Sequence, residues 1–180
     1  MLKRIVILCL IVLSLSLSGA KDALALGGVK SYIDAKSGYQ FLYPNGWVEI
    51  KIKNGVVLHD LIEQSENVSV IVNPLPEKKT LQDLGTPSDV GYKLSKVALA
   101  PPGSGREAEL INAQSREVGD KVYYILEYVI KLPDQQLRHN LASVAISRGK
   151  LFTFNANVNE KRWPKVKSIL EPVVKSFSVD

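Results

Sequence analysis

The sequence has very little cysteine and histidine, and this excludes several kinds of chemistry at once. Its one cysteine, Cys9, lies in an apolar stretch near the N-terminus, and only two histidines occur among 180 residues. The rest of the chain can therefore form no disulfide, no thiolate metal site and no cysteine nucleophile. Its stability must come from a hydrophobic core, and from position 26 onward the chain is long enough to build one in a single domain.

Long apolar runs are also missing, apart from one at the N-terminus. Lys3 and Arg4 precede a mainly apolar run at 5–17, and Ala-Leu-Ala at 23–25 follows as a small-residue cleavage motif. This order predicts a secretory signal peptide over residues 1–25. A spanning helix needs roughly 20 apolar residues, so an uncleaved membrane anchor is the alternative that fits less well.

A strong excess of one charge is absent as well. The chain has 23 basic and 18 acidic residues, a formal net charge of +5. Loss of residues 1–25 would remove three bases and one acid and leave +3. Bases and acids are interspersed, without the dense basic stripe of nucleic-acid-binding proteins, so we expect no nucleic-acid partner. A modest cationic face that docks on an acidic protein is compatible with this charge.

Motifs for catalysis are missing too. No G-x-S-x-G nucleophile elbow, phosphate-binding loop or dinucleotide fingerprint occurs in the sequence. Two acids could still meet as a glycosidase-like pair, but nothing in the sequence singles out two of them. We therefore expect no enzymatic activity, with an exported hydrolase as the alternative.

The sequence does contain many short strand-like runs separated by turns. Residues 39–44 and 47–52 are aromatic and β-branched, and Pro44-Asn45-Gly46 between them predicts a hairpin. Asn54-Gly55 predicts a second turn of the same kind. Short connections containing Gly or Pro make the last four runs an antiparallel meander. The further strand-like runs are 56–62, 67–75, 108–118, 121–132, 137–148 and 151–158.

Two segments have helical rather than strand periodicity. The first can begin at Thr86-Pro87 and is stopped by Pro101-Pro102. The second follows Trp163 and carries an apolar stripe, with Pro172 expected to kink it or to begin a new turn. The apolar face expected of the first helix is Val90, Leu94, Val97 and Ala98.

These elements predict an α+β fold. We expect a central antiparallel sheet of about six strands with helices on both faces, an α-β-α sandwich. The single domain is expected over residues 38–180, and residues 26–37 are expected to form a flexible leader before it.

His139 is the strongest candidate for a metal ligand. It lies on the outgoing strand of a predicted hairpin, and the next strand ends near Glu160. Antiparallel pairing can bring this imidazole and carboxylate together as an N/O site for zinc or manganese, completed by water or a partner. The alternative is a half-exposed strand histidine with local hydrogen bonds. His59-Asp60 is a weaker pair, because adjacent strand residues point to opposite faces.

Lys161 and Arg162 are candidates for partner binding. They come at the start of the last helix, where the helix dipole favours acids over bases. They are either solvated residues without a function or bases kept at an unfavourable position for an acidic partner. We expect Trp163, the next residue, to anchor the helix in the core while the two bases face outward.

Three stretches together carry a resemblance to a known family. They are GYQFLYPNGWVEI at 38–50, RHNLASVAISRGKLFTFNANVNEKRW at 138–163 and VVKSFSV at 173–179. In this combination the chain resembles the PsbP family, the extrinsic luminal proteins of photosystem II, over nearly all of residues 30–180. Without a long N-terminal extension, it is most similar to the cyanobacterial branch.

The resemblance implies a protein of the thylakoid lumen, peripheral to the membrane and without catalytic activity. Plant-type members support the retention of calcium and chloride at the manganese cluster of the oxygen-evolving centre. Cyanobacterial-type members are more similar to assembly factors that meet early reaction-centre modules. The partners implied are photosystem II subunits or assembly intermediates, with no required cofactor. The alternative function is a luminal carrier of zinc, manganese or calcium.

The resemblance also points to the metal site. Some family members bind zinc or manganese through a histidine and an acid that correspond to His139 and Glu160 here. Glutamate in place of the more usual aspartate keeps the charge but lengthens the side chain. The chain lacks both a lipobox cysteine and the longer N-terminal segment of plant-type members, so we expect an assembly or stabilising role rather than direct ion retention.

Overall fold

The computed structural model describes residues 28–75 and 79–180, so the predicted signal peptide lies outside the described residues. Within these ranges no helix is both long and apolar enough to cross a membrane. The elements are β1 (Val29–Asp34), β2 (Tyr39–Pro44), β3 (Val48–Ile52), β4 (Gly55–His59), β5 (Asn67–Pro74), η1 (Gln82–Leu84), α1 (Pro87–Leu94), η2 (Ser95–Leu99), β6 (Glu107–Val118), β7 (Lys121–Lys131), β8 (Leu137–Ser147), β9 (Lys150–Asn159), η3 (Glu160–Arg162), α2 (Trp163–Lys175) and β10 (Ser178–Val179).

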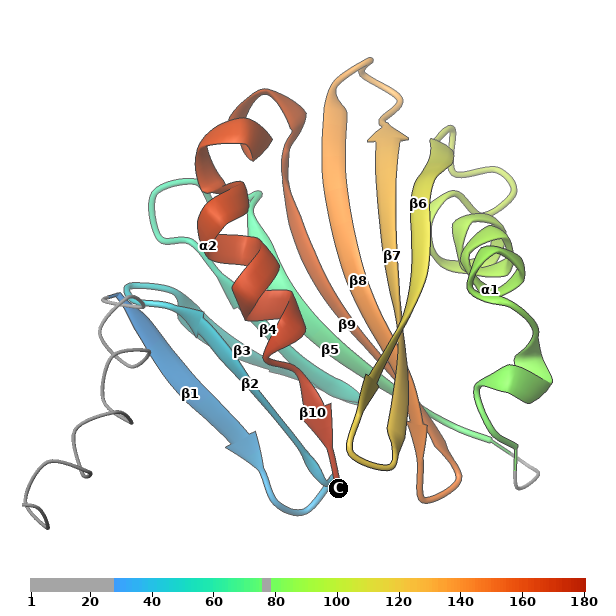
Figure 1. Cartoon of the computed structure of the whole chain (residues 1–180). Coiled ribbons are helices and arrows are strands. Elements are labelled where there is room, and N and C mark those ends of the chain that lie inside the picture. The colour runs from blue at the N-terminus through green and yellow to red at the C-terminus, as the bar shows by residue number, and fades with distance from the viewer. Residues whose placement is uncertain (1–27, 76–78) are drawn as a thin grey trace, which may run out of the picture.

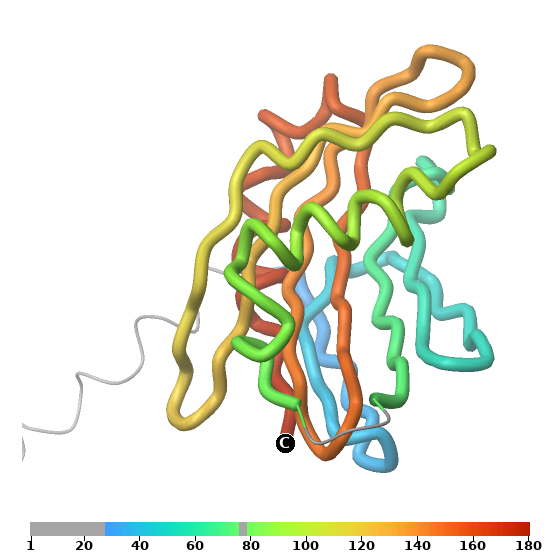
Figure 2. Tube along the Cα trace, turned by 90° about the vertical axis from the view of Figure 1, so that its right-hand side faces the viewer, coloured from blue at the N-terminus to red at the C-terminus, as the bar shows by residue number. Residues whose placement is uncertain are grey.

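The strands form a large and a small antiparallel sheet. The large sheet has seven strands in the order β3-β4-β5-β9-β8-β7-β6, and the small sheet has the order β1-β2-β10. The small sheet and α2 lie on one side of the large sheet (Figure 1). Figure 2 shows α1 on the other side. The predicted α+β sandwich is confirmed, with more strands than the six expected.

Each face of the large sheet has its own core, because side chains alternate between the two faces along a strand. Tyr123 of β7 joins the core under α2, whereas Tyr124 joins the core under α1. The core under α2 is rich in aromatic rings: Phe154 lies 4.7 Å from Phe41 and 5.3 Å from Phe177, measured between ring centroids. Trp163, 7% exposed, belongs to the same core, so it anchors α2 as predicted.

The hairpin predicted around Pro44-Asn45-Gly46 does not form. β2 pairs with β1 and β10, whereas β3 pairs with β4, so the chain crosses from the small sheet to the large sheet at this turn. Gly46 has a φ of 84°, which glycine adopts without strain. The turn residues were therefore interpreted correctly, but they do not determine which strand pairs with the next one.

The expected flexible leader at 26–37 is also corrected. Residues 29–34 form β1, which pairs with β2 along its whole length. Tyr32 of β1 stacks on Phe41, with 5.0 Å between the ring centroids. Pairing with β2 and this stacking hold the segment in the small sheet, so the domain begins before residue 38.

The second predicted turn, Asn54-Gly55, joins β3 to β4 as expected. Gly55 has a φ of 155°, and a Cβ atom there would lie 1.8 Å from the carbonyl oxygen of Val70 on β5. The hairpin therefore requires glycine at this position. The predicted meander is confirmed as well, since β6, β7, β8 and β9 follow one another as antiparallel neighbours.

The apolar face predicted for the first helix is correct only in its first half. Thr86 caps α1 and Val90 is buried, as the sequence indicates. The helix then widens into the π-helical turn η2, which shifts the residues that follow. As a result Val97 is 71% exposed, and Leu99 packs against the core in place of Ala98.

Candidate functional site

The candidate site is built around His139 on β8, whose side chain is only 3% exposed. Its Nδ1 atom lies 2.9 Å from Oε2 of Glu160, and its Nε2 atom lies 2.9 Å from Oε1 of Glu127. The imidazole stacks on the indole of Trp163, with 3.9 Å between centroids and 14° between the planes. We call these four residues the histidine site. The alternative of a half-exposed strand histidine is wrong, because the ring is buried between two carboxylates and an indole.

Strand register explains how these residues meet. On β7 the residue opposite His139 is Val129, and Glu127 lies two positions further along the same face. On β9 the residue opposite is Val158, two residues before Glu160 begins η3. Antiparallel pairing thus brings His139 and Glu160 together as the sequence indicated. Their role in metal binding stays a prediction.

The hydrogen bonds of the site limit its protonation states. Two ionised carboxylates, one on each ring nitrogen, need two N–H donors, and a neutral imidazole has only one. The contacts of His139 are therefore satisfied either by an imidazolium or by a carboxyl group that keeps its proton on Glu127 or Glu160. In either state the ring is held at both edges and on one face, which fixes its orientation.

The site has the donors for part of a metal centre. Imidazole nitrogen and carboxylate oxygen are both ligands for zinc, so Nδ1 of His139 and Glu160 would provide two. Glu127, bonded to Nε2, would be the outer carboxylate that orients a ligating histidine. In the described part of the chain, no group of three or more His, Cys, Asp or Glu residues is placed to hold one ion. The remaining ligands would have to come from water or a partner.

The weaker candidate pair, His59-Asp60, does not converge. Nδ1 of His59 contacts the backbone carbonyl of Asp60 at 3.1 Å, not its carboxylate. That carboxylate accepts hydrogen bonds from the backbone N–H groups of Ile62 and Glu63 and from the indole N–H of Trp47. The backbone N–H of Glu63 has the largest effect and, with the other donors, lowers the pKa of Asp60 against the opposing effect of burial.

Lys161 and Arg162 follow Glu160 in η3, and they differ in solvent exposure and in ion pairing. Nη1 of Arg162 lies 3.4 Å from Oε2 of Glu66, a carboxylate that is only 2% exposed. The other oxygen of Glu66 accepts a hydrogen bond from the backbone N–H of Asn159. Lys161 is exposed, whereas Arg162 is 44% exposed and partly used to pair with Glu66. The expectation of two outward bases is therefore met fully by Lys161 and only in part by Arg162.

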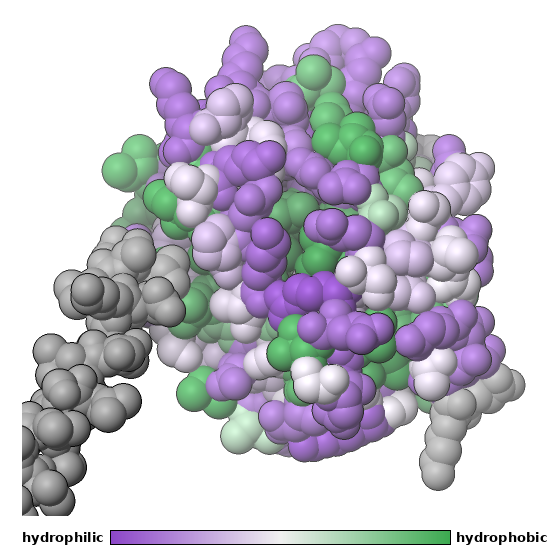
Figure 3. All heavy atoms as spheres, in the orientation of Figure 1, coloured by the Kyte–Doolittle hydropathy of each residue, from purple (hydrophilic) through white to green (hydrophobic). Residues whose placement is uncertain are grey.

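A cavity of about 440 Å³ lies beside Arg162, between α2 and the start of the small sheet. Trp47, Val166 and Ile169 make much of its wall apolar, and Asp60 and Glu66 add carboxylates. The surface that carries α2 is mainly hydrophilic, with small hydrophobic groups scattered over it (Figure 3). Arg162 thus lines a partly apolar hollow, and Lys161 precedes it in the chain.

Sequence reasoning missed Glu127 and Glu66. Glu127 is the one acid within an otherwise apolar run of β7, and a lone carboxylate at such a position was a signal that it has a buried partner. Glu66 comes from a polar loop of the sequence, EQSEN, where nothing marks it as the buried residue that it is. Only the fold shows that it bonds to the start of η3.

The fold and the site together define an α-β-α sandwich whose buried histidine is held between two carboxylates. Residues 27–179 match the PsbP family, and the chain belongs to this family. It is 47% identical to CyanoP of Thermosynechococcus vestitus, over 86% of this chain and 88% of that protein. It is 44% identical to CyanoP of Synechocystis sp., over 99% of this chain and 97% of that one.

A solved structure agrees with these relationships. The solution structure of cyanobacterial PsbP (CyanoP) from Synechocystis sp. PCC 6803 matches this chain with a TM-score of 0.74 and 46% sequence identity. The match covers 87% of this chain and 95% of that structure. The resemblance to the cyanobacterial branch of the PsbP family is therefore confirmed.

Proposed function

We propose that this chain is a non-catalytic protein of the thylakoid lumen that assists the assembly or stabilisation of photosystem II and its oxygen-evolving centre. Its similarity to CyanoP over 99% of its length carries this proposal. The predicted signal peptide at 1–25 supports export to the lumen. Membership of the PsbP family supports a peripheral position on the luminal membrane face. The histidine site adds support, since both ring nitrogens of His139 are bonded to carboxylates and neither is free to act as a general base.

The surface proposed to meet photosystem II subunits or assembly intermediates is formed by Lys161 and Arg162. Both lie in η3, directly after the residues that bond His139 and Glu66, so they stand on a rigid base. Positive groups on a rigid support favour binding of an acidic partner, because folding has already ordered the backbone that carries them and binding loses less conformational entropy.

A pull-down from thylakoid membranes tests this proposal. The tagged protein is expected to recover photosystem II subunits, and the variant Lys161→Glu/Arg162→Glu is expected to recover at least fivefold less. The matched control is Lys96→Glu/Lys165→Glu, which changes the net charge equally at exposed positions on η2 and α2. Equal recovery by the two variants would show that η3 is not the contact surface, and no recovery by the wild type would refute the photosystem II role.

A second candidate function is a carrier of zinc, manganese or calcium. The observation that favours it is the 2.9 Å distance between Nδ1 of His139 and Oε2 of Glu160, with Glu127 bonded to the other ring nitrogen, Nε2. Calorimetric titration with Zn²⁺ or Mn²⁺ is expected to give at least tenfold weaker affinity for His139→Ala than for the wild type. His59→Ala is the matched control and is expected to bind like the wild type. Identical affinities for all three proteins would exclude the histidine site as a metal centre.

A further inference from the structure

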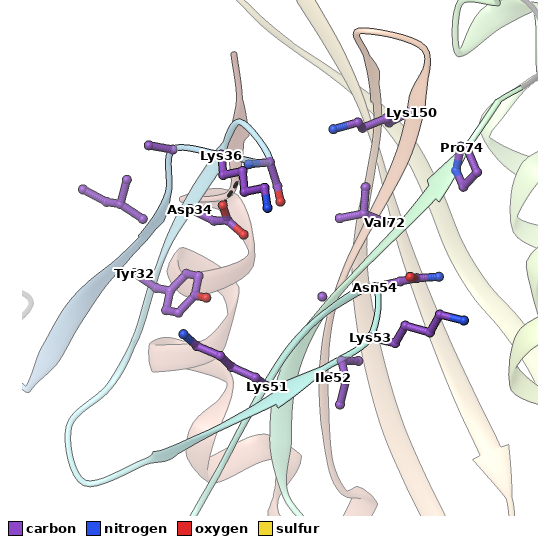
Figure 4. Close-up of a pocket in the computed structure, with 14 residues that line it drawn as sticks. Tyr32, Asp34, Lys36, Lys51, Ile52, Lys53, Asn54, Val72, Pro74 and Lys150 are labelled. Carbon is purple, nitrogen blue, oxygen red and sulfur yellow. Dashed lines mark hydrogen bonds between the residues drawn. The ribbon is translucent and has the colours of Figure 1, made fainter.

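A cleft of about 690 Å³ lies at the other end of the large sheet from the histidine site (Figure 4). Its walls come from the turn between β1 and β2, from β3 and its turn into β4, and from the ends of β5 and β9. Four of its lining residues are lysines from separate positions in the fold. We call it the lysine cleft, after Lys36, Lys51, Lys53 and Lys150.

The lining of the lysine cleft has an excess of positive charge, with four lysines and one aspartate. Among the described residues, none of the four lysines forms a salt bridge. The one carboxylate in the lining, Asp34, accepts a hydrogen bond of 2.8 Å from the backbone N–H of Ser37. In Figure 4, Lys51 extends toward Tyr32 and Lys150 extends from the opposite wall toward the turn between β1 and β2. The cleft therefore offers several ammonium groups that form no salt bridge within residues 28–75 and 79–180.

The same cleft offers an unpaired strand and apolar side chains. β3 is the end strand of the large sheet, so its outer edge has no strand partner in the described part of the chain. All five residues of β3 are exposed. Ile33 and Ile52 in the lining are 66% and 37% exposed, and Val72 lies between the walls. An unpaired edge beside apolar and charged groups is what an extended segment needs in order to add to a sheet.

We propose that the lysine cleft binds an extended acidic segment of another protein, laid along β3. A segment in which acids alternate with apolar residues would direct carboxylates to Lys36, Lys51 and Lys150 on one side. Its other side would contact Ile52, which lies on the opposite face of the large sheet from Lys51. The lysines line a hollow rather than a flat face, and a chain segment can enter a hollow that a bilayer surface cannot. This inference does not depend on the proposed function, because the histidine site lies elsewhere.

Fluorescence anisotropy with a labelled peptide of four Glu-Val repeats tests the inference. The wild type is expected to bind this peptide and not a Lys-Val peptide, and binding is expected to weaken as salt rises. Lys36→Glu/Lys51→Glu/Lys150→Glu is expected to bind at least tenfold more weakly. The matched control Lys96→Glu/Lys165→Glu/Lys175→Glu changes the net charge equally at exposed sites and is expected to stay within twofold of the wild type.

Three outcomes would overturn the inference. Equal losses in the two triple variants would mean attraction by net charge alone. Binding to phosphatidylglycerol vesicles but not to the peptide, lost in the cleft variant, would assign the lysines to a membrane surface. Self-association of Lys36→Gln/Lys51→Gln/Lys150→Gln, with no peptide binding by the wild type, would mean that the lysines only protect the edge strand. Thermal unfolding followed by circular dichroism verifies that each variant is folded.

Discussion

The two ends of the large sheet use their charged side chains in opposite ways. At the histidine site, His139 bonds to Glu127 and Glu160, and nearby Arg162 bonds to Glu66. At the lysine cleft, four lysines line a hollow and none forms a salt bridge among the described residues. Charges that are satisfied internally hold a structure in one geometry, whereas charges left unpaired are available to a partner. We therefore expect stability to depend on the paired groups of the first end, and recognition to depend on the exposed bases: Lys161 beside the histidine site and the lysines of the cleft.

Removal of the imidazole is expected to have the largest effect on stability. His139→Ala leaves Glu127 and Glu160 without their shared hydrogen-bond partner and opens a space under Trp163. Breaking a largely buried pair in this way costs about 3 kcal/mol of unfolding free energy. Urea unfolding followed by tryptophan fluorescence measures it, with Lys161→Ala as the neutral control. A loss below about 1 kcal/mol would show that the histidine site is not a structural element, and the comparison between the two ends would fail.

Glu66 is expected to give the second largest effect. Glu66→Ala removes a buried carboxylate that accepts the N–H of Asn159 and faces Arg162. The loss of this acceptor is expected to cost about 2 kcal/mol in urea unfolding. Glu66→Gln keeps an acceptor oxygen and is expected to lose less, which separates the hydrogen bond from the charge. Equal losses for both variants would assign the whole effect to the charge.

Asp60 predicts a pH dependence at the same end of the sheet. Its pKa is lowered in the folded protein, chiefly by the backbone N–H of Glu63, with Ile62 and Trp47 adding to the effect. A carboxyl group with a lowered folded pKa stabilises the protein above its unfolded pKa, about 3.9, and this contribution is lost as pH falls through the folded pKa. Asp60→Asn is therefore expected to be less stable than the wild type at pH 7, with the difference shrinking below about pH 4. A difference that stays constant across urea unfolding from pH 7 to pH 2 would contradict this assignment.

The lysines of the cleft are expected to have the smallest effect on stability. Lys36→Ala, Lys51→Ala and Lys150→Ala remove side chains that have no salt-bridge partner among the described residues, so each is expected to change the unfolding free energy by less than about 0.5 kcal/mol. Urea unfolding of the three variants and of His139→Ala compares the loss of unfolding free energy at the two ends of the large sheet. A loss above about 1 kcal/mol at any of them would mean that the cleft also has a structural role.

Local sequence patterns correctly predicted the parts of the fold that depend on contacts between segments close together in the sequence. β6 to β9 are long strands joined by short turns. A short turn keeps consecutive strands adjacent in space, so each strand pairs with the one before it. The approach of His139 to Glu160 followed from the same register. The turn at Pro44-Asn45-Gly46 has equally clear chemistry, but the prediction of a hairpin there was wrong. β2 finds its partners in β1 and in β10 at the far end of the chain, and nothing near the turn encodes that choice.

The sequence was sufficient to predict the family, the α+β class, the meander and the approach of a histidine to an acid, because each follows from motifs, periodicity or pairing between adjacent strands. The three-dimensional fold was needed to show that β1, β2 and β10 form a separate sheet, that Glu127 bonds the second ring nitrogen of His139, and that lysines far apart in the chain line one cleft. These features depend on contacts between segments distant in sequence. Such contacts are selected by the packing of the whole core, not by any local pattern.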